Sequence, residues 1–175
     1  PAAVDRQARA IDLRGIWGEV EKVEALRRYL LSHTQENKSF QRLLAQNAMQ
    51  HRPPLGGFFR DFSLAKKGEH KNTVDLKIQG LAPFVDGMRV LALAHGVEAV
   101  NTLDRLRLLM SKGVIDRLDG EAYEEAYHFI QLLRMQEHHR QAREGLEYSN
   151  RIAPHKLNNL DKRILRESLR QAQRL

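Results

Sequence analysis

The chain has 175 residues, of which 42% are hydrophobic, 29% charged and 6% aromatic, and it contains no cysteine. This length allows one sizeable hydrophobic core but does not argue for two, and the low aromatic and proline content disfavours all-β architectures. The lack of cysteine excludes disulfides, thiol catalysis and cysteine-ligated zinc and agrees with a reducing compartment, so we expect a cytoplasmic protein.

The net charge of +7 comes from 29 basic and 22 acidic residues. Such an excess favours phosphate-bearing partners, nucleotides or RNA, but a soluble surface rich in arginine is the preferred explanation. No apolar run approaches the roughly 18 residues that span a bilayer, so no membrane contact is expected. Because the chain starts without methionine, we expect it to be a piece of a longer protein.

Apolar residues recur with the helical period of 3.6 in residues 19–33 and 36–50. The second segment ends before Pro53 and Pro54, because the residue before a proline is pushed out of the α region. A polar, glycine-containing stretch follows and is typical of an exposed loop. Alternation over residues 73–78 predicts a strand, which can pair with residues 58–62 as a small hairpin flap.

Helical periodicity resumes over residues 81–96, 101–113 and 116–144 and again from residue 159 onward. Asn101 is a suitable N-cap for its segment. We therefore predict an all-α fold, an antiparallel helical bundle of four main helices plus shorter ones. The bundle would carry a small irregular or β-hairpin flap.

Basic residues gather in or beside the non-helical insert. They are Arg52, Arg60, Lys66, Lys67, Lys71, Lys77 and Arg89. On a strand, Asp75 and Lys77 would face the same side. The two can pair with each other, or the lysine can meet a ligand phosphate, and the sequence leaves both readings open.

Several ordered motifs resemble one known family, the putative nucleotidyltransferase substrate-binding domain. The motifs are LAQNAMQHRPPLG at 44–56, DLK at 75–77, GLAP at 80–83, Arg89 with ALAHG at 92–96, NTLDRL at 101–106, LLR at 132–134 and NRI at 150–152. In that family the domain ends a polypeptide that often begins with cyclic-nucleotide-binding and CBS domains. A nucleotidyltransferase domain similar to that of PII uridylyltransferases lies between them.

The resemblance implies a substrate-binding domain over residues 18–175, preceded over residues 1–17 by a remnant strand or linker of the upstream nucleotidyltransferase domain. The parent protein would transfer a nucleoside monophosphate from a nucleoside triphosphate to a protein acceptor in bacterial signal transduction. The motif residues expected to bind substrate are Arg52, Asp75, Lys77, Arg89 and Arg105.

Residues 11–14, IDLR, resemble the strand that supplies the third metal-binding carboxylate of such enzymes, which would make Asp12 a catalytic residue. Alternatively, Asp12 caps the first helix or pairs with Arg14. The resemblance implies Mg²⁺ for the full-length enzyme, because cations neutralise charge on the triphosphate. The acidic pair that holds magnesium is absent from this sequence, so we expect no metal, no cofactor and no transferase activity in this chain alone.

The expected partners are the nucleotidyltransferase domain in cis, a nucleoside triphosphate, a protein acceptor and, as a further candidate, a second copy of the chain. One alternative is a non-catalytic helical bundle for protein interaction or oligomerisation. A second is an RNA-cleaving helical domain, because Arg134 and His139 have a spacing that resembles the signature of such domains. That alternative requires the two side chains to converge.

Overall fold

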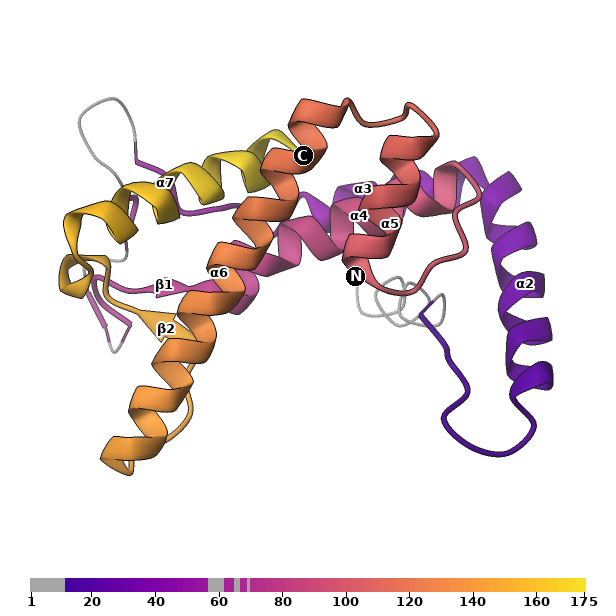
Figure 1. Cartoon of the computed structure of the whole chain (residues 1–175). Helices are drawn as coiled ribbons and strands as arrows, with labels where there is room; N and C mark the ends of the chain where they lie inside the picture. Colours follow the sequence, from indigo (N-terminus) through magenta and orange to yellow (C-terminus); the bar gives the residue numbers. More distant parts are fainter. Residues whose placement is uncertain (1–11, 57–61, 65–66, 69) are drawn as a thin grey trace. The chain divides into compact units, whose positions relative to one another are not determined.

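The computed structural model describes residues 12–56, 62–64, 67–68 and 70–175, and Figure 1 shows that most of them are helical. These residues form six α-helices and one two-stranded antiparallel sheet, which confirms the predicted all-α class. The chain divides into two compact units. Unit 1 comprises Pro1–Gln50 and Val85–Gly120, and unit 2 comprises His51–Phe84 and Glu121–Leu175.

Unit 1 begins with α2 (Val20–Glu36) and α3 (Lys38–Ala48), close to the predicted segments. Asn37 separates them, and its side chain accepts a hydrogen bond from the Phe40 amide at 2.9 Å, which starts α3. Leu44 of α3 is buried with Leu93, and apolar neighbours pack against this pair. The apolar residues of α2 are less covered, since Leu26 is 51% exposed.

The other helices of unit 1 also follow the predicted segments. The helix α4 (Ala82–Ala94) has its last ten residues in this unit, and Gly96 follows it with a φ of 62°. The helix α5 (Thr102–Ser111) starts where the Asn101 side chain accepts hydrogen bonds from the amides of Leu103 and Asp104. Its inner face contributes Leu106 and Leu109 to the core.

Most of α6 (Arg117–Glu144) and all of α7 (Asn159–Arg174) belong to unit 2. The Asn158 side chain accepts a hydrogen bond from the Asp161 amide at 2.8 Å, which caps α7. The core of this unit consists of buried apolar side chains from α6, α7, β2 and the segment that runs from β1 through η1 into the first turn of α4. They are Val74, Leu76, Leu81, Phe84, Tyr123, Ala126, Ile130, Leu133, Ile152, Leu165, Leu169 and Ala172.

The predicted strand and hairpin differ from the structure. Only Val74–Asp75 is a strand, β1, and it pairs antiparallel with β2 (Arg151–Ile152), as Figure 1 shows. The partner expected for it, residues 58–62, lies largely outside the described residues. The next six residues, Leu76–Leu81, form a π-helical turn, η1, that runs directly into α4. The strand predicted over residues 73–78 is therefore confirmed at Val74 and Asp75 and is wrong from Leu76 onward.

The π-helical turn has a physical cause at each end. Its first amides, those of Lys77 and Ile78, donate to the Asp75 carboxylate at 3.0 and 2.9 Å. At its other end, Gly80 lies so close to α6 that an added Cβ would come within 2.9 Å of the Ile130 Cγ2 atom. The absence of a side chain at position 80 thus allows the turn to pack tightly.

Candidate functional site

Asp12 lies at the centre of a charged cluster in unit 1. Its Oδ2 accepts hydrogen bonds from the Nε and Nη2 atoms of Arg89, at 3.1 and 2.7 Å. Its Oδ1 accepts a hydrogen bond from the Nη2 of Arg105 at 2.5 Å. The Nη1 of Arg89 also bonds Asp86, and the Nε of Arg105 bonds the Ala99 carbonyl. Two arginines from α4 and α5 therefore share one carboxylate.

Burial explains why the two guanidiniums need this partner. Arg105 is 2% exposed and Arg89 is 8% exposed, and a buried charge is costly unless it is paired and hydrogen-bonded. With Asp12 and Asp86, the cluster contains two positive and two negative charges. The cluster fixes the start of the described chain to α4 and α5. Asp12 pairs with Arg89 and Arg105, so its predicted pairing with Arg14 is wrong. Its predicted capping of the first helix is also wrong, because Glu19 stands at the N-cap of α2.

The described residues do not fit a magnesium ion at Asp12. Both of its carboxylate oxygens accept guanidinium hydrogens, so neither faces an open coordination position. No group of three or more histidine, aspartate or glutamate side chains in the described part of the chain could hold a metal. Residue 12 lies in a turn and residues 13–16 are irregular, so no strand forms there. A catalytic role for Asp12 stays a prediction.

A second group of predicted site residues lies in unit 2, around β1. Asp75 has its side chain engaged by the amides of η1, and its own amide donates to the Gln79 side chain at 2.9 Å. The nearest cation to its carboxylate is Arg151 of β2, at 3.6 Å, and not Lys77. Asp75 therefore shapes the turn and ties β1 to β2.

Lys77 is exposed at the surface of the same turn, and its side chain makes no ion pair or hydrogen bond with the residues that the structure describes. Its exposed neighbour Ile78 is 45% accessible. Arg52 is also exposed and lies in the segment that follows α3. Of the five predicted substrate-binding residues, Arg89 and Arg105 belong to unit 1 and are buried around Asp12. Arg52, Asp75 and Lys77 belong to unit 2, where Asp75 is half-buried and the other two are exposed.

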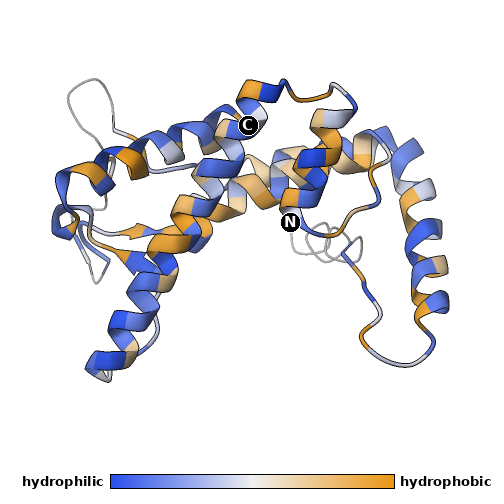
Figure 2. Ribbon diagram, viewed as in Figure 1, coloured by the Kyte–Doolittle hydropathy of each residue, from blue (hydrophilic) through white to orange (hydrophobic). Residues whose placement is uncertain are grey.

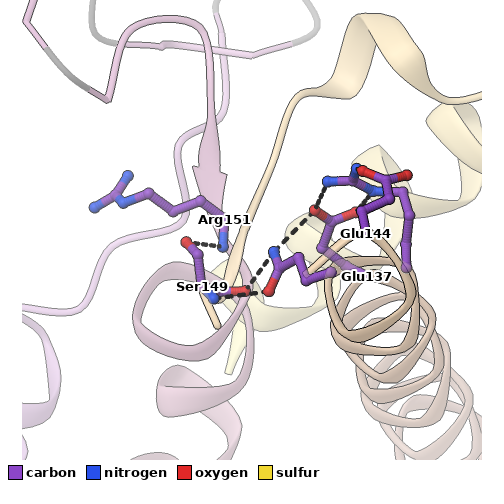
Figure 3. A network of polar contacts seen from close by, with 6 residues as sticks. Glu137, Glu144, Ser149 and Arg151 are labelled. Atoms are coloured by element: carbon purple, nitrogen blue, oxygen red, sulfur yellow. Dashed lines mark hydrogen bonds and ion pairs between the residues drawn. The ribbon is translucent and has the colours of Figure 1, made fainter. Parts of the chain in front are cut away.

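A polar network that the sequence did not predict connects α6 to β2 (Figure 3). The Gln141 side chain, 4% exposed, accepts a hydrogen bond from the Ser149 amide at 2.8 Å and donates to the Ser149 carbonyl at 3.2 Å. It also donates to Glu137 at 2.9 Å. The Ser149 hydroxyl then accepts from the Arg151 amide, which continues the network into the sheet. No local pattern marks a buried glutamine, so only the structure reveals this role.

Glu137 is the carboxylate of this network that accepts hydrogen bonds from both Arg140 and Gln141. Arg140 donates two hydrogen bonds to it, at 2.6 and 3.0 Å, and also contacts Glu144. These bonds hold the pKa of Glu137 below its ordinary value despite the opposing effect of burial, and the hydrogen bond from Gln141 lowers it further. The arrangement keeps the carboxylate ionised and fixed, which is a structural task and not that of a general acid.

The geometry does not support RNA cleavage through Arg134 and His139. Residues five apart on an α-helix point about 140° away from each other. The Nε of Arg134 donates to the Asn150 side chain at 2.7 Å, which places it against the chain before β2. His139 is exposed and lines a surface hollow with Gln136, Arg140, Arg143 and Glu144, and Arg134 is not among the residues that line it. The hypothesis of RNA cleavage requires the two side chains to converge on one phosphate. They do not converge, so the hypothesis is wrong.

Comparison with known proteins adds one finding. Residues 38–175 match the family described as putative nucleotidyltransferase substrate binding domain. The chain belongs to this family. Neither the search of curated proteins nor that of solved structures gave a match. Among the described residues, every helix is too short or too polar to cross a membrane.

The family match confirms the resemblance read from the sequence and associates this substrate-binding domain with a nucleotidyltransferase. It spans α3 to α7, and so includes the turn of Asp75 and Lys77 as well as both buried arginines. Residues 12–37, with Asp12 and α2, lie before the matched range. The Asp12 cluster is therefore a contact between the preceding segment and two helices of the substrate-binding domain.

Proposed function

We propose that this chain is the acceptor-binding part of a cytoplasmic signalling protein that transfers a nucleoside monophosphate from a nucleoside triphosphate to another protein. The observation that carries the proposal is the family match over residues 38–175. In this proposal the preceding nucleotidyltransferase domain and its magnesium ions supply the chemistry of transfer, and this chain alone is inactive. Residues 1–17 belong to the connection between the two domains.

The turn at β1 supports a binding role for Lys77. Asp75 holds the first amides of η1, so the lysine that follows is presented to solvent on a fixed backbone. A fixed backbone lowers the entropy lost when an acidic partner binds, because only the Lys77 side chain has to be ordered. Arg52 adds a second exposed cation in the same unit. The buried Arg89 and Arg105 contribute by fixing the connection through Asp12.

The proposal is tested in the full-length parent with α-labelled UTP and ATP, magnesium and cell extract. We expect label on a protein acceptor and a clear loss of labelling in Lys77→Ala. The matched control is Lys71→Ala, which removes the same charge from an exposed lysine that precedes β1. Absence of labelling with either nucleotide, in a folded protein, would favour the alternative of a helical module for protein interaction or self-association.

A further inference from the structure

The part of α6 that belongs to unit 2 has an exposed side opposite its buried one. Exposed residues recur along this side at alternating intervals of three and four positions. They form an outer stripe that consists of Glu125, His128, Leu132, Met135, His139 and Ala142. The buried residues Ala126, Ile130 and Leu133 lie on the other side of the helix. Alternation of three and four is the spacing with which two helices pair along a shared seam.

The apolar part of the outer stripe lies at its centre. Leu132 is 52% exposed and Met135 is 68% exposed. In Figure 2, orange residues lie in the middle of α6, whereas its last turns are mostly blue, the colour of hydrophilic residues. Apolar contact with a partner is therefore confined to the middle of the stripe. The charges toward its two ends decide which partner fits.

The charges of α6 are unevenly distributed along the helix. Its first half, 117–130, contains four acidic residues and one basic residue, whereas its second half, 131–144, contains two acidic and three basic residues. Two parallel copies of the helix would place like charges side by side. Two antiparallel copies would place the acidic half of one against the basic half of the other.

One acid and one base are available for contact with a partner. The exposed side chains of Glu125 and Arg143 make no ion pair or hydrogen bond with the residues that the structure describes. The other charges near the end of the helix are engaged, since Arg140 pairs with both Glu137 and Glu144. Glu125 and Arg143 can therefore meet a partner without breaking an existing contact.

The positions of Glu125 and Arg143 also match an antiparallel pair. They are 18 residues apart. This separation is about five full turns, so both side chains leave the helix in the same direction, about 27 Å apart along its axis. A two-fold axis halfway between them brings Glu125 of each copy next to Arg143 of the other. The same axis places Leu132 and Met135 of both copies at the centre of the contact.

We propose that two copies of this chain pair antiparallel through the outer stripe of α6. Leu132 and Met135 form the apolar centre of the contact, and two reciprocal ion pairs between Glu125 and Arg143 close its ends. The partner is a second copy because the stripe is complementary to itself about a two-fold axis. This pairing goes beyond the proposed function and does not depend on it, because Lys77 lies on η1 and not on α6.

Sedimentation equilibrium of the 175-residue chain over a wide range of concentrations tests the pairing. We expect the mean mass to rise from that of one chain towards that of two, without larger species. Met135→Lys should weaken self-association at least about tenfold, because it places two cations in the apolar centre. The matched control is Leu160→Lys, which changes an apolar residue of comparable exposure, 64%, on α7 of the same unit. Circular dichroism verifies that both variants keep their helical content.

The antiparallel orientation is tested by Glu125→Arg and Arg143→Glu. Each variant alone turns both ion pairs into like-charge contacts and should weaken self-association about five- to tenfold at low salt. In a mixture of the two variants, every such contact between unlike copies again joins opposite charges. We therefore expect the mixed pair to form about as tightly as the original pair.

Three results would overturn the proposal. One is a chain that stays monomeric at every concentration, which would leave the outer stripe to a different protein or domain. Another is equal weakening by Met135→Lys and Leu160→Lys, which would show diffuse apolar attraction. The third is a mixture of the two charge variants that associates no better than either alone. None of these results bears on acceptor labelling through Lys77, so failure here is distinguishable from failure of the proposed function.

Discussion

Replacing Gly80 by alanine tests the close approach of the π-helical turn to α6. The new methyl group would lie 2.9 Å from Cγ2 and 3.6 Å from Cδ1 of Ile130, and 3.9 Å from Cδ2 of Leu169. Both neighbours are 0% exposed. The Cγ2 atom is attached directly to the Cβ of Ile130, so it cannot rotate away as the end of a longer side chain would. The backbone of the turn or of α6 must therefore shift.

The magnitude follows from two opposing effects. Inserting a methyl group into a packed core costs about 1–3 kcal/mol. Alanine has a higher helix propensity than glycine, which offsets up to about 1 kcal/mol of this cost. We expect a net loss of about 1–2 kcal/mol in the free energy of unfolding. For a chain of this size the loss lowers the melting temperature by roughly 2–8 °C.

Urea denaturation followed by circular dichroism measures the effect, provided that the m value stays unchanged. A double-mutant cycle with Ile130→Leu gives the control, because leucine lacks the methyl group on Cβ. We expect the cost of Gly80→Ala to fall by at least about 0.5 kcal/mol in that background. A Gly80→Ala protein as stable as the original, or more stable, would refute the reasoning.

Three further changes test the polar contacts. Asp12→Ala should lower the free energy of unfolding in urea by about 3–5 kcal/mol, because it leaves the buried Arg105 charge without a carboxylate; an unchanged value would show that the cluster does not fix the segment. Gln141→Met should cost about 1–3 kcal/mol and speed hydrogen exchange of the Ser149 amide, whereas unchanged exchange would count against the network. The folded-state pKa of Glu137 lies below its ordinary value of 4.5, so its contribution to stability is present at neutral pH and is lost as the pH falls through the folded value. Glu137→Gln should therefore be less stable than the original at pH 7 and converge with it below pH 4.5 in urea unfolding at several pH values; a difference independent of pH would contradict this assignment.

Local signals explain what the sequence predicts well. Asn101 precedes a segment of helical period and caps α5 as expected. The second predicted helix stops before Pro53 and Pro54, and α3 ends before them, at Ala48. These features depend on neighbouring residues along the chain. The helix boundaries therefore follow from the sequence within a few residues.

Contacts between distant residues explain what the sequence does not predict. Val74 pairs with Ile152, and no pattern near either residue names the other as its partner. The period-two pattern at residues 73–78 also suits a capped π-helical turn, because Asp75 can serve as its cap. Arg105 appears in a motif that suggests ligand binding, yet its burial and its bond to Asp12, 93 positions away, emerge only from the fold.

For the predicted site residues, the sequence likewise gives the residue types but not their burial. The sequence identified the basic residues near the insert but could not separate Lys77, which is exposed, from Arg89, which is buried.

The most direct test of the central claim is whether this chain binds the protein that the parent labels. The labelled acceptor from the transfer assay would be purified and titrated against the immobilised 175-residue chain by surface plasmon resonance. We predict saturable binding that Lys77→Ala weakens and Lys71→Ala leaves unchanged. An acceptor that shows no binding, or binds equally well to Lys77→Ala, would contradict the account of this domain as an acceptor-binding surface built on the β1 turn.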